Sequence, residues 1–408
     1  MAEFASDTIF DILSRLPVKS LACFRCVSKL WCAYIDDDYF GILHGERVVE
    51  ELTPLMYDPN LSCIVGFDII KSEEGKFTLE AKKVMYLESE LKASCSKYRE
   101  YIVGGSTNRG YLVGGSCNGL LYLSLHDILH ITSLAVIHPL RKEFYKLPPM
   151  QRLLSGLYYL TEDSRGLGFD VSNNTFKMVC VLSRRKFSES GIFDLISKDL
   201  CTMVHVIGMD SSWREIPQVP PYPIEGDGIF AHGCLYWKGV YLYHESRSKS
   251  KSRGELICFD VRNEEFKTIC PPKKIGWYDY SVTYQLIDLH GEVGYAYFYN
   301  DSIEVWILKQ KQWAKHCRFN RKPPLHRTDY MVLGRWNKDG DIFIKAYAVE
   351  INLFVYSLKS QLLEKVNTVS KEYGLKESYM YMYPASSTFS IRGINKTAHS
   401  IETDLDSD

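Results

Sequence analysis

The spacing of apolar side chains changes once along this chain, soon after its first forty residues. In residues 4–40 apolar positions recur at every third or fourth residue, which is typical of short amphipathic helices. Pro17 cannot continue a helix, but it suits the first turn of the next one. The pattern therefore predicts three helices, with Ser6 and Ser28 as candidate N-caps of the first and the third. Their apolar stripes are Ile9, Ile12, Leu13 and Leu16, then Val18, Leu21, Phe24 and Val27, then Trp31, Tyr34 and Ile35.

These helices carry more large apolar side chains than so small a unit can bury. A domain of about 40 residues seldom hides enough surface to be stable alone. The remaining side chains must pack either on the rest of the chain, as a helical cap, or on a partner protein. The pattern of residues leaves both possibilities open.

From about residue 45 the pattern changes to short strand-like runs separated by Gly, Pro, Asn and Asp. An apolar run, a polar turn and a second run beginning at an aromatic or aliphatic residue recur seven times. In two copies Phe-Asp-Val is followed by Phe-Lys at the same offset, in 169–177 and 259–267. The seven copies are 65–79, 137–149, 169–179, 207–217, 259–272, 306–316 and 355–366.

A recurring unit of about 45 residues with four short strands is typical of a β-propeller blade. We expect each copy to be the hairpin that joins the two outer strands of a blade. The predicted fold class is mainly β with a small all-α N-terminal domain, a three-helix unit followed by a β-propeller-like domain. Six to eight blades are expected, with seven favoured; the alternative is an irregular array of β-sandwiches.

The changes of pattern divide the chain into four segments. Residues 1–45 form the helical unit, and residues 46–98 a linker with a first β-unit. Residues 99–393 form the propeller-like domain, and residues 394–408 a disordered acidic tail ending in Glu-Thr-Asp-Leu-Asp-Ser-Asp.

Composition excludes several classes of protein. The formal net charge is −1, so we expect no general attraction to nucleic acid or to an anionic membrane. No apolar run is long enough to cross a bilayer, and the N-terminus lacks the basic and apolar regions of a secretory signal. The twelve cysteines are scattered, which favours free thiols in a reducing compartment, here the cytoplasm or nucleus.

The sequence offers no recognisable catalytic or metal-binding constellation. Cys23 and Cys26 form a CxxC, but they lie in a predicted helix without a second pair. His205 and His232 fall in predicted strands and show no metal-ligand spacing. The paired glycines 104–105 and 114–115 lack the pattern of a phosphate-binding loop and are expected to begin blade strands. We therefore expect no catalytic residue, no metal and no cofactor.

Two kinds of segment could carry binding. The serine-rich basic stretch 246–253 is expected to be a solvated loop, a phosphorylation site or a weak nuclear address. Aromatic residues in loops are common anchors of binding faces. The loop aromatics here are Tyr222, Trp277, Tyr278 and Tyr280. Tyr379, Tyr381 and Tyr383 alternate along the chain, so they are either further anchors or one face of a strand.

The segment 13–35 resembles an F-box, the adaptor-binding motif of SCF-type ubiquitin ligases. The match rests on Ile12-Leu13, Leu16-Pro17, Leu21, Arg25, Val27-Ser28-Lys29 and Trp31, whereas Phe4-Ala5 stands where the family usually has Leu-Pro. The resemblance implies a Skp1-like adaptor as partner and, through it, a cullin. It assigns adaptor contact to Leu13, Leu16, Pro17, Val18, Leu21, Val27, Ser28 and Trp31.

Residues 100–366 resemble the F-box-associated domain of plant F-box proteins, which is related to kelch-type propellers. The match rests on segments in the family's order, with His138-Pro139 in place of the usual Asn-Pro and Tyr236 in place of a frequent His. These segments are 116–123, 138–149, 166–179, 211–217, 228–239, 255–269 and 302–316.

Together the resemblances imply a non-catalytic receptor subunit of an SCF-type E3 ubiquitin ligase. The helices would dock the adaptor, and the propeller would hold an unknown target protein for ubiquitination and degradation. Tethering the target beside the transferring enzyme would raise its effective concentration. The alternatives are an F-box scaffold that acts outside a ligase and a propeller enzyme or glycan-binding module with a helical cap.

Overall fold

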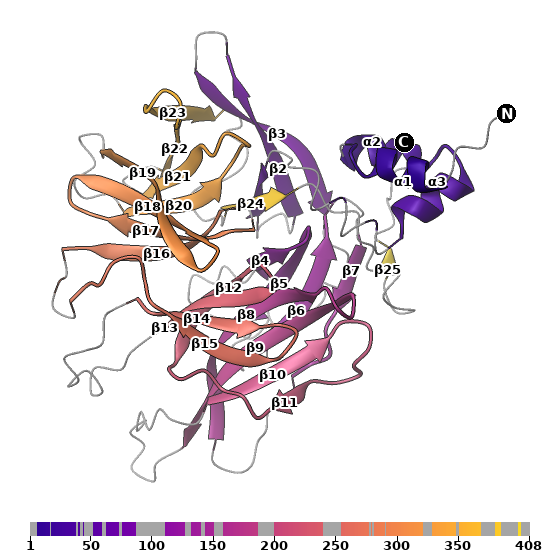
Figure 1. The fold of residues 1–408 in the computed structure, drawn as a ribbon, viewed down its shortest axis with the longest axis horizontal. Helices are drawn as coiled ribbons and strands as arrows, with labels where there is room; N and C mark the ends of the chain where they lie inside the picture. Colours follow the sequence, from indigo (N-terminus) through magenta and orange to yellow (C-terminus); the bar gives the residue numbers. More distant parts are fainter. Residues whose placement is uncertain are drawn as a thin grey trace, which may run out of the picture.

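The computed structural model places three short helices to one side of a larger part built from strands (Figure 1). It describes residues 6–16, 18–37, 40, 44, 52–58, 63–72, 76–86, 111–126, 132–139, 143–150, 158–186, 200–239, 254–276, 279, 281–289, 291–320, 329–347, 351–368, 380–384 and 399–400. The helices are α1 (Ser6–Leu13), α2 (Val18–Phe24) and α3 (Lys29–Ile35). This arrangement confirms the predicted fold class.

The strands of the described residues form six four-stranded antiparallel groups, which we call blades 1 to 6. Within each blade except blade 1, the strands follow one another along the chain. Blade 1 contains β24 (Met380–Pro384), β1 (Leu52–Asp58), β2 (Cys63–Lys71) and β3 (Phe77–Tyr86). Blade 2 contains β4 (Tyr111–Cys117), β5 (Leu120–His126), β6 (Thr132–His138) and β7 (Glu143–Lys146). Blade 3 contains β8 (Tyr158–Asp170), β9 (Thr175–Lys186), β10 (Leu200–Val206) and β11 (Arg214–Ile216).

The remaining three blades complete the ring. Blade 4 contains β12 (Ile224–Ala231), β13 (Cys234–Gly239), β14 (Leu256–Asp260) and β15 (Glu265–Ile269). Blade 5 contains β16 (Thr283–Asp288), β17 (Val293–Phe298), β18 (Ser302–Lys309) and β19 (Gln312–Asn320). Blade 6 contains β20 (Asp329–Arg335), β21 (Ile342–Tyr347), β22 (Ile351–Tyr356) and β23 (Leu363–Thr368).

The inner strands of the blades contact one another around a closed circle. β4 contacts β8, β8 contacts β12, β12 contacts β16, β16 contacts β20, and β20 contacts β24. The circle closes in blade 1, where β24 pairs antiparallel with β1, which in turn contacts β4. A strand from the C-terminal part of the chain therefore completes the blade that begins the ring, and this closure protects the inner sheet edges.

Seven hairpin copies correspond to six blades because blade 3 holds two of them. Copy 169–179 is the β8–β9 hairpin, at the inner side of the blade, and copy 207–217 is the β10–β11 hairpin. The six blades of the described residues lie within the predicted range of six to eight, although seven were favoured. The assignment of 169–179 to two outer strands was wrong. The other five copies do join the two outer strands of blades 1, 2, 4, 5 and 6.

The two Phe-Asp-Val copies have the same local geometry, although they occupy different places in their blades. Phe169 pairs with Phe176, and Phe259 with Phe266, with ring centroids 4.8 Å apart in both cases. In each turn the Asp side chain accepts hydrogen bonds from residues two and three positions later, which fixes the turn.

The segment 394–408 is partly ordered, contrary to the expected disordered tail. His399–Ser400 form β25, which pairs with Glu143 and Phe144 at the outer edge of blade 2. The other residues of this segment lie outside the described part of the chain.

Candidate functional site

The helical bundle has a small core of its own. Leu13, Leu21, Ile35 and Phe40 are buried together, and Leu16, Phe24 and Trp31 pack partly buried against them. The Phe24 and Trp31 rings meet edge to face, 5.2 Å apart. The leucines that form the predicted stripes therefore hold the bundle together.

Polar contacts fix how the helices of the bundle begin and end. Ser28 is the N-cap of α3, as predicted, because its hydroxyl accepts a hydrogen bond from the backbone N–H of Trp31 at 3.1 Å. The Arg25 guanidinium, which follows α2, donates to Asp36 at the end of α3 at 2.7 Å. This hydrogen bond raises the pKa of Arg25, although burial opposes it, so the cation that ties α2 to α3 is permanent.

Part of the bundle's apolar surface remains exposed. Ile12, Val27 and Leu30 each have more than half of their surface accessible to solvent. Ten large apolar side chains are exposed in the described part of the chain, and these three lie within the short helical unit. Isolated exposed apolar residues are ordinary, but this local concentration makes the bundle a candidate surface for a partner.

The structure divides the eight predicted adaptor contacts into different groups. Val27 and Ser28 are exposed, and Leu16 and Trp31 are half-buried against the bundle core. Leu13 and Leu21 are almost fully buried in the bundle core, and their assignment to adaptor contact stays a prediction. Pro17 and the Val18 side chain lie outside the described residues.

Leu30 is the exposed residue that the sequence reasoning missed. It lies in the first turn of α3, whereas Val27 precedes the N-cap Ser28 and belongs to no helix. Its apolar character was visible in the sequence, but Leu30 falls between Lys29 and Trp31 of the matching motif and was not considered separately.

Large aromatic side chains from the second strands of blades 2 and 4 pack between neighbouring blades. The Tyr122 hydroxyl, from β5, donates to an Asp227 carboxylate oxygen on β12 at 2.6 Å and contacts the Arg165 carbonyl on β8 at 3.3 Å. Gly114 makes room for this ring, since a Cβ there would lie 2.0 Å from Tyr122 Cε2. Glycines 114–115 lie in the middle of β4 and do not begin it as expected, and glycines 104–105 lie outside the described residues.

An equivalent arrangement occurs in blade 4. Trp237, on the second strand, donates its indole N–H to the Arg165 carbonyl at 3.0 Å and is fully buried. A Cβ at Gly228 would lie 2.6 Å from Trp237 Cε2. Glycines on inner strands thus make room for large aromatic side chains, whose hydrogen bonds join blades 2, 3 and 4.

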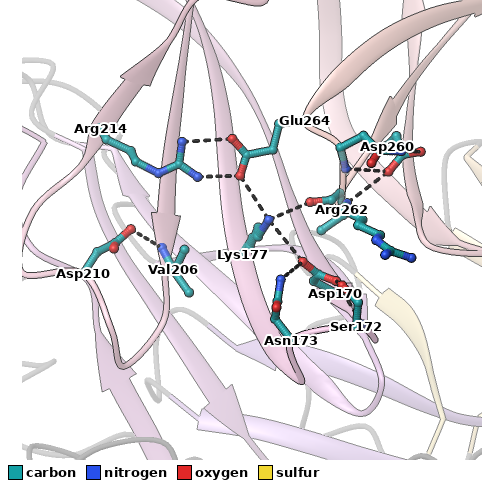
Figure 2. A network of polar contacts seen from close by, with 12 residues as sticks. Asp170, Ser172, Asn173, Lys177, Val206, Asp210, Arg214, Asp260, Arg262 and Glu264 are labelled. Atoms are coloured by element: carbon teal, nitrogen blue, oxygen red, sulfur yellow. Dashed lines mark hydrogen bonds and ion pairs between the residues drawn. The ribbon is translucent and has the colours of Figure 1, made fainter.

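A polar network joins the β8–β9 hairpin and β11 of blade 3 to the β14–β15 turn of blade 4 (Figure 2). Lys177 Nζ lies 3.3 Å from an Asp170 oxygen, 3.0 Å from a Glu264 oxygen and 2.8 Å from the Val261 carbonyl. Arg214 adds a two-pronged ion pair to Glu264. Burial alone would raise the pKa of Glu264, but the bonds from Arg214 and Lys177 outweigh it and lower that pKa. The network is fully paired, and it joins blades without offering a free group for chemistry.

The two histidines considered as ligands have ordinary partners. His205 is buried in β10 near the Tyr145 hydroxyl, at 3.2 Å, and burial lowers its pKa. His232 lies in the β12–β13 turn and not in a strand as expected, and it pairs with Glu292 at 2.8 Å. In the part of the chain that the structure describes, no group of three or more His, Cys, Asp and Glu residues could hold a metal ion. No described helix has the length and apolarity that crossing a bilayer requires.

Several predicted binding segments lie outside the described residues, including 246–253, Trp277, Tyr278, Tyr280 and Tyr379. Tyr222 is half-buried after β11. Tyr381 and Tyr383 lie in β24 and pack in one cluster with blade 2, so these two form one face of a strand. The buried Tyr383 hydroxyl donates to the Gly119 carbonyl at 2.7 Å, which ties the closing strand to blade 2.

Comparison with known proteins identifies both parts of the chain. The F-box domain matches residues 4–43, and the F-box associated beta propeller domain matches residues 77–386. Two Arabidopsis thaliana relatives are F-box protein At2g23160, 25% identical over 77% of this chain and 92% of its own length, and F-box protein At1g30790, 24% identical over 76% and 73%.

Among solved structures, AofleA from Arthrobotrys oligospora covers 84% of this chain and 92% of its own chain, with 8% identity and a TM-score of 0.38. The two family matches carry the assignment, because together they span the helical bundle and the ring of blades. The chain belongs to the plant F-box proteins that carry an F-box associated β-propeller domain.

Proposed function

We propose that this protein is the substrate-recognition subunit of an SCF-type E3 ubiquitin ligase. Its helical bundle docks a Skp1-like adaptor and, through the adaptor, a cullin, while its propeller holds a target protein. The observation that carries the proposal is the exposed apolar surface at Ile12, Val27 and Leu30 on a bundle that already has its own core. A cap on the propeller would bury such residues against the blades.

We assign the propeller a binding role. Tyr122 and Trp237 pack between blades 2, 3 and 4, and the polar network around Lys177 is internally paired. The chemistry of ubiquitin transfer then belongs to the enzyme recruited by the cullin, and this chain contributes proximity. The eleven cysteines in the described residues are all free, which agrees with a site of action in the cytoplasm or nucleus.

The docking surface is tested by replacing exposed residues, so that the bundle core is left intact. The variant Val27→Glu/Leu30→Glu places charge on the surface without touching Leu13 or Leu21. We expect the full-length variant to lose co-purification of the Skp1-like adaptor, because an apolar contact would then bury two unpaired charges. Circular dichroism should show an unchanged fold.

The matched control is Val171→Glu/Met209→Glu, which changes two equally exposed apolar residues of blade 3 and its loops. This control should retain the adaptor. Adaptor retained by both variants would refute docking through this surface. Target half-life in cells, measured with and without the protein, then separates a ligase subunit from an F-box scaffold that does not promote degradation.

A further inference from the structure

Three cations converge on one buried carboxylate on blade 5. Glu304, on β18, has only 3% of its side chain exposed. Lys315 Nζ lies 3.3 Å from its Oε1, Arg318 Nη1 lies 3.5 Å from the same atom, and Lys273 Nζ contacts Oε2. We call Lys273, Lys315 and Arg318 the blade-5 basic cluster.

A β-bulge brings two of these cations to the same face of the sheet. Trp306 is paired with Lys315 and Glu304 with Arg318, so one extra residue, His316, is inserted in β19 between them. In a regular strand, residues three apart point to opposite faces. Because of the bulge, Lys315 and Arg318 both reach Glu304, and the insertion is held by His316, whose ring contacts the Gly340 carbonyl at 2.9 Å.

The third cation comes from the segment that connects blades 4 and 5. Lys273 donates to the Tyr299 hydroxyl at 2.6 Å, and its backbone N–H donates to the Tyr297 hydroxyl at 3.2 Å. Trp313 fixes the start of this connection by donating its indole N–H to the Cys270 carbonyl at 2.7 Å. The ammonium groups of Lys273 and Lys315 also lie 5.9 and 5.7 Å from the centre of the half-buried Trp306 ring.

The cluster carries more positive charge than its own carboxylate balances. Burial would raise the pKa of Glu304, but hydrogen bonds from Lys273, Trp306 and Lys315 outweigh burial and lower it, so Glu304 is ionised. One carboxylate therefore faces three cations. Asp301 lies at the edge of the cluster and accepts a hydrogen bond from the Ser302 hydroxyl, which in turn accepts one from Arg318. Asp301 forms no ion pair with the three cations in the described structure.

The cations keep donors directed to solvent. The side chains of Lys273, Lys315 and Arg318 are 34%, 45% and 52% exposed. Glu304 beneath them sets their positions, while the aromatic rings of Trp306 and Tyr299 stiffen them. Preorganised cations of this kind bind a negatively charged group with little loss of side-chain entropy.

We propose that the blade-5 basic cluster binds an acidic segment of the target protein, whose carboxylates contact Lys273, Lys315 and Arg318. This inference rests on the proposed function, since it names the chemistry of the target that the propeller holds. Charge complementarity carries it: the uncompensated positive charge accepts carboxylates, and the aromatic rings accept the apolar part of the segment.

The test uses the full-length protein and a fluorescent peptide of Glu, Ser and Gly, with the same peptide carrying Gln in place of Glu as the neutral probe. Fluorescence anisotropy should show binding of the acidic peptide and not of the neutral one. The variant Lys315→Gln/Arg318→Gln should weaken binding by about tenfold or more, which corresponds to losing two charged contacts. Added salt should weaken the wild-type complex.

The matched control is Arg262→Gln/Lys267→Gln, which removes two exposed cations from blade 4. It should leave peptide binding unchanged. Equal binding of the peptide by the wild type and by Lys315→Gln/Arg318→Gln overturns the proposal, as does equal binding of the neutral probe. Binding of single-stranded RNA through the same two residues, with no binding of the acidic peptide, also overturns it.

Adaptor co-purification separates this inference from the proposed function. Lys315→Gln/Arg318→Gln should retain the adaptor, and Val27→Glu/Leu30→Glu should retain the acidic peptide. If the adaptor results are as expected but the peptide results are not, the error lies in the blade-5 site. If the adaptor is not bound by the wild type, the ligase assignment fails whatever the peptide does.

Discussion

Lys177 of blade 3 and Glu264 of blade 4 form an ion pair of 3.0 Å between residues that are 87 positions apart. Lys177 extends from the first hairpin of its blade, and Glu264 occupies the turn of the last hairpin of the next blade, with a positive φ of 58°. Its counterpart in the blade 3 hairpin is Asn174, with φ 52°. A side chain as long as Glu at this turn position thus serves the contact between the blades.

Lys177→Met should lower the free energy of unfolding of the propeller by about 3 kcal/mol, because it leaves the Asp170 carboxylate buried without its cation. Chemical denaturation followed by tryptophan fluorescence measures the change. Lys267→Met, on the exposed side of β15, is the control and should change stability by less than about 0.5 kcal/mol.

The same variant should alter the acid sensitivity of the protein. Burial would raise the pKa of Asp170, but hydrogen bonds from Ser172, Asn173 and Lys177 lower it, and the pKa of Glu264 is lowered as well. Their stabilisation is present above the unfolded pKa values, about 4, and is lost as pH falls through the lower folded values. The difference between wild type and Lys177→Met should therefore shrink in acid, and a difference independent of pH would contradict the ionic origin.

Gly114→Ala should destabilise the propeller by about 2 kcal/mol or more, because the new methyl group would lie 2.0 Å from Tyr122 Cε2. Tyr122 cannot move away without breaking its hydrogen bond to Asp227. Thermal unfolding measures the effect. Gly276→Ala is the matched control, since a Cβ there meets no atom within 4 Å. If both variants unfold at the same temperature, Gly114 is not needed for the close approach of Tyr122.

Local sequence patterns predicted most of the secondary structure and less of its assembly. The spacing of apolar residues predicted the three helices, and all seven expected hairpins are present, because turn chemistry and alternation act over a few residues. The number of blades was not predictable in this way. Copies 169–179 and 259–272 share the same local geometry, although one is the inner hairpin and the other the outer hairpin of a blade.

The candidate binding surfaces depend on contacts that the sequence does not display. Leu21 and Val27 belong to the same predicted stripe, yet one is buried and the other exposed, because α2 ends at Phe24 and Val27 lies in the turn after it. Strict alternation would place Lys315 and Arg318 on opposite faces of β19, and the bulge at His316 reverses that expectation. The basic cluster could be found only once the register of the strands was known.

Lys345→Met should raise the free energy of unfolding at neutral pH by about 2 kcal/mol. It should also remove the increase of that free energy with pH that the wild type shows in alkaline solution. Burial in β21 lowers the pKa of Lys345 from 10.5 to about 8. Between these two values the unfolded chain binds more protons than the folded one, so the free energy of unfolding of the wild type increases with pH in that window. Denaturation curves recorded from pH 7 to about pH 10 measure the slope. Lys365→Met, at an exposed position of β23, is the control and should keep the wild-type increase of unfolding free energy with pH. An unchanged slope in Lys345→Met would show that another group titrates in this range.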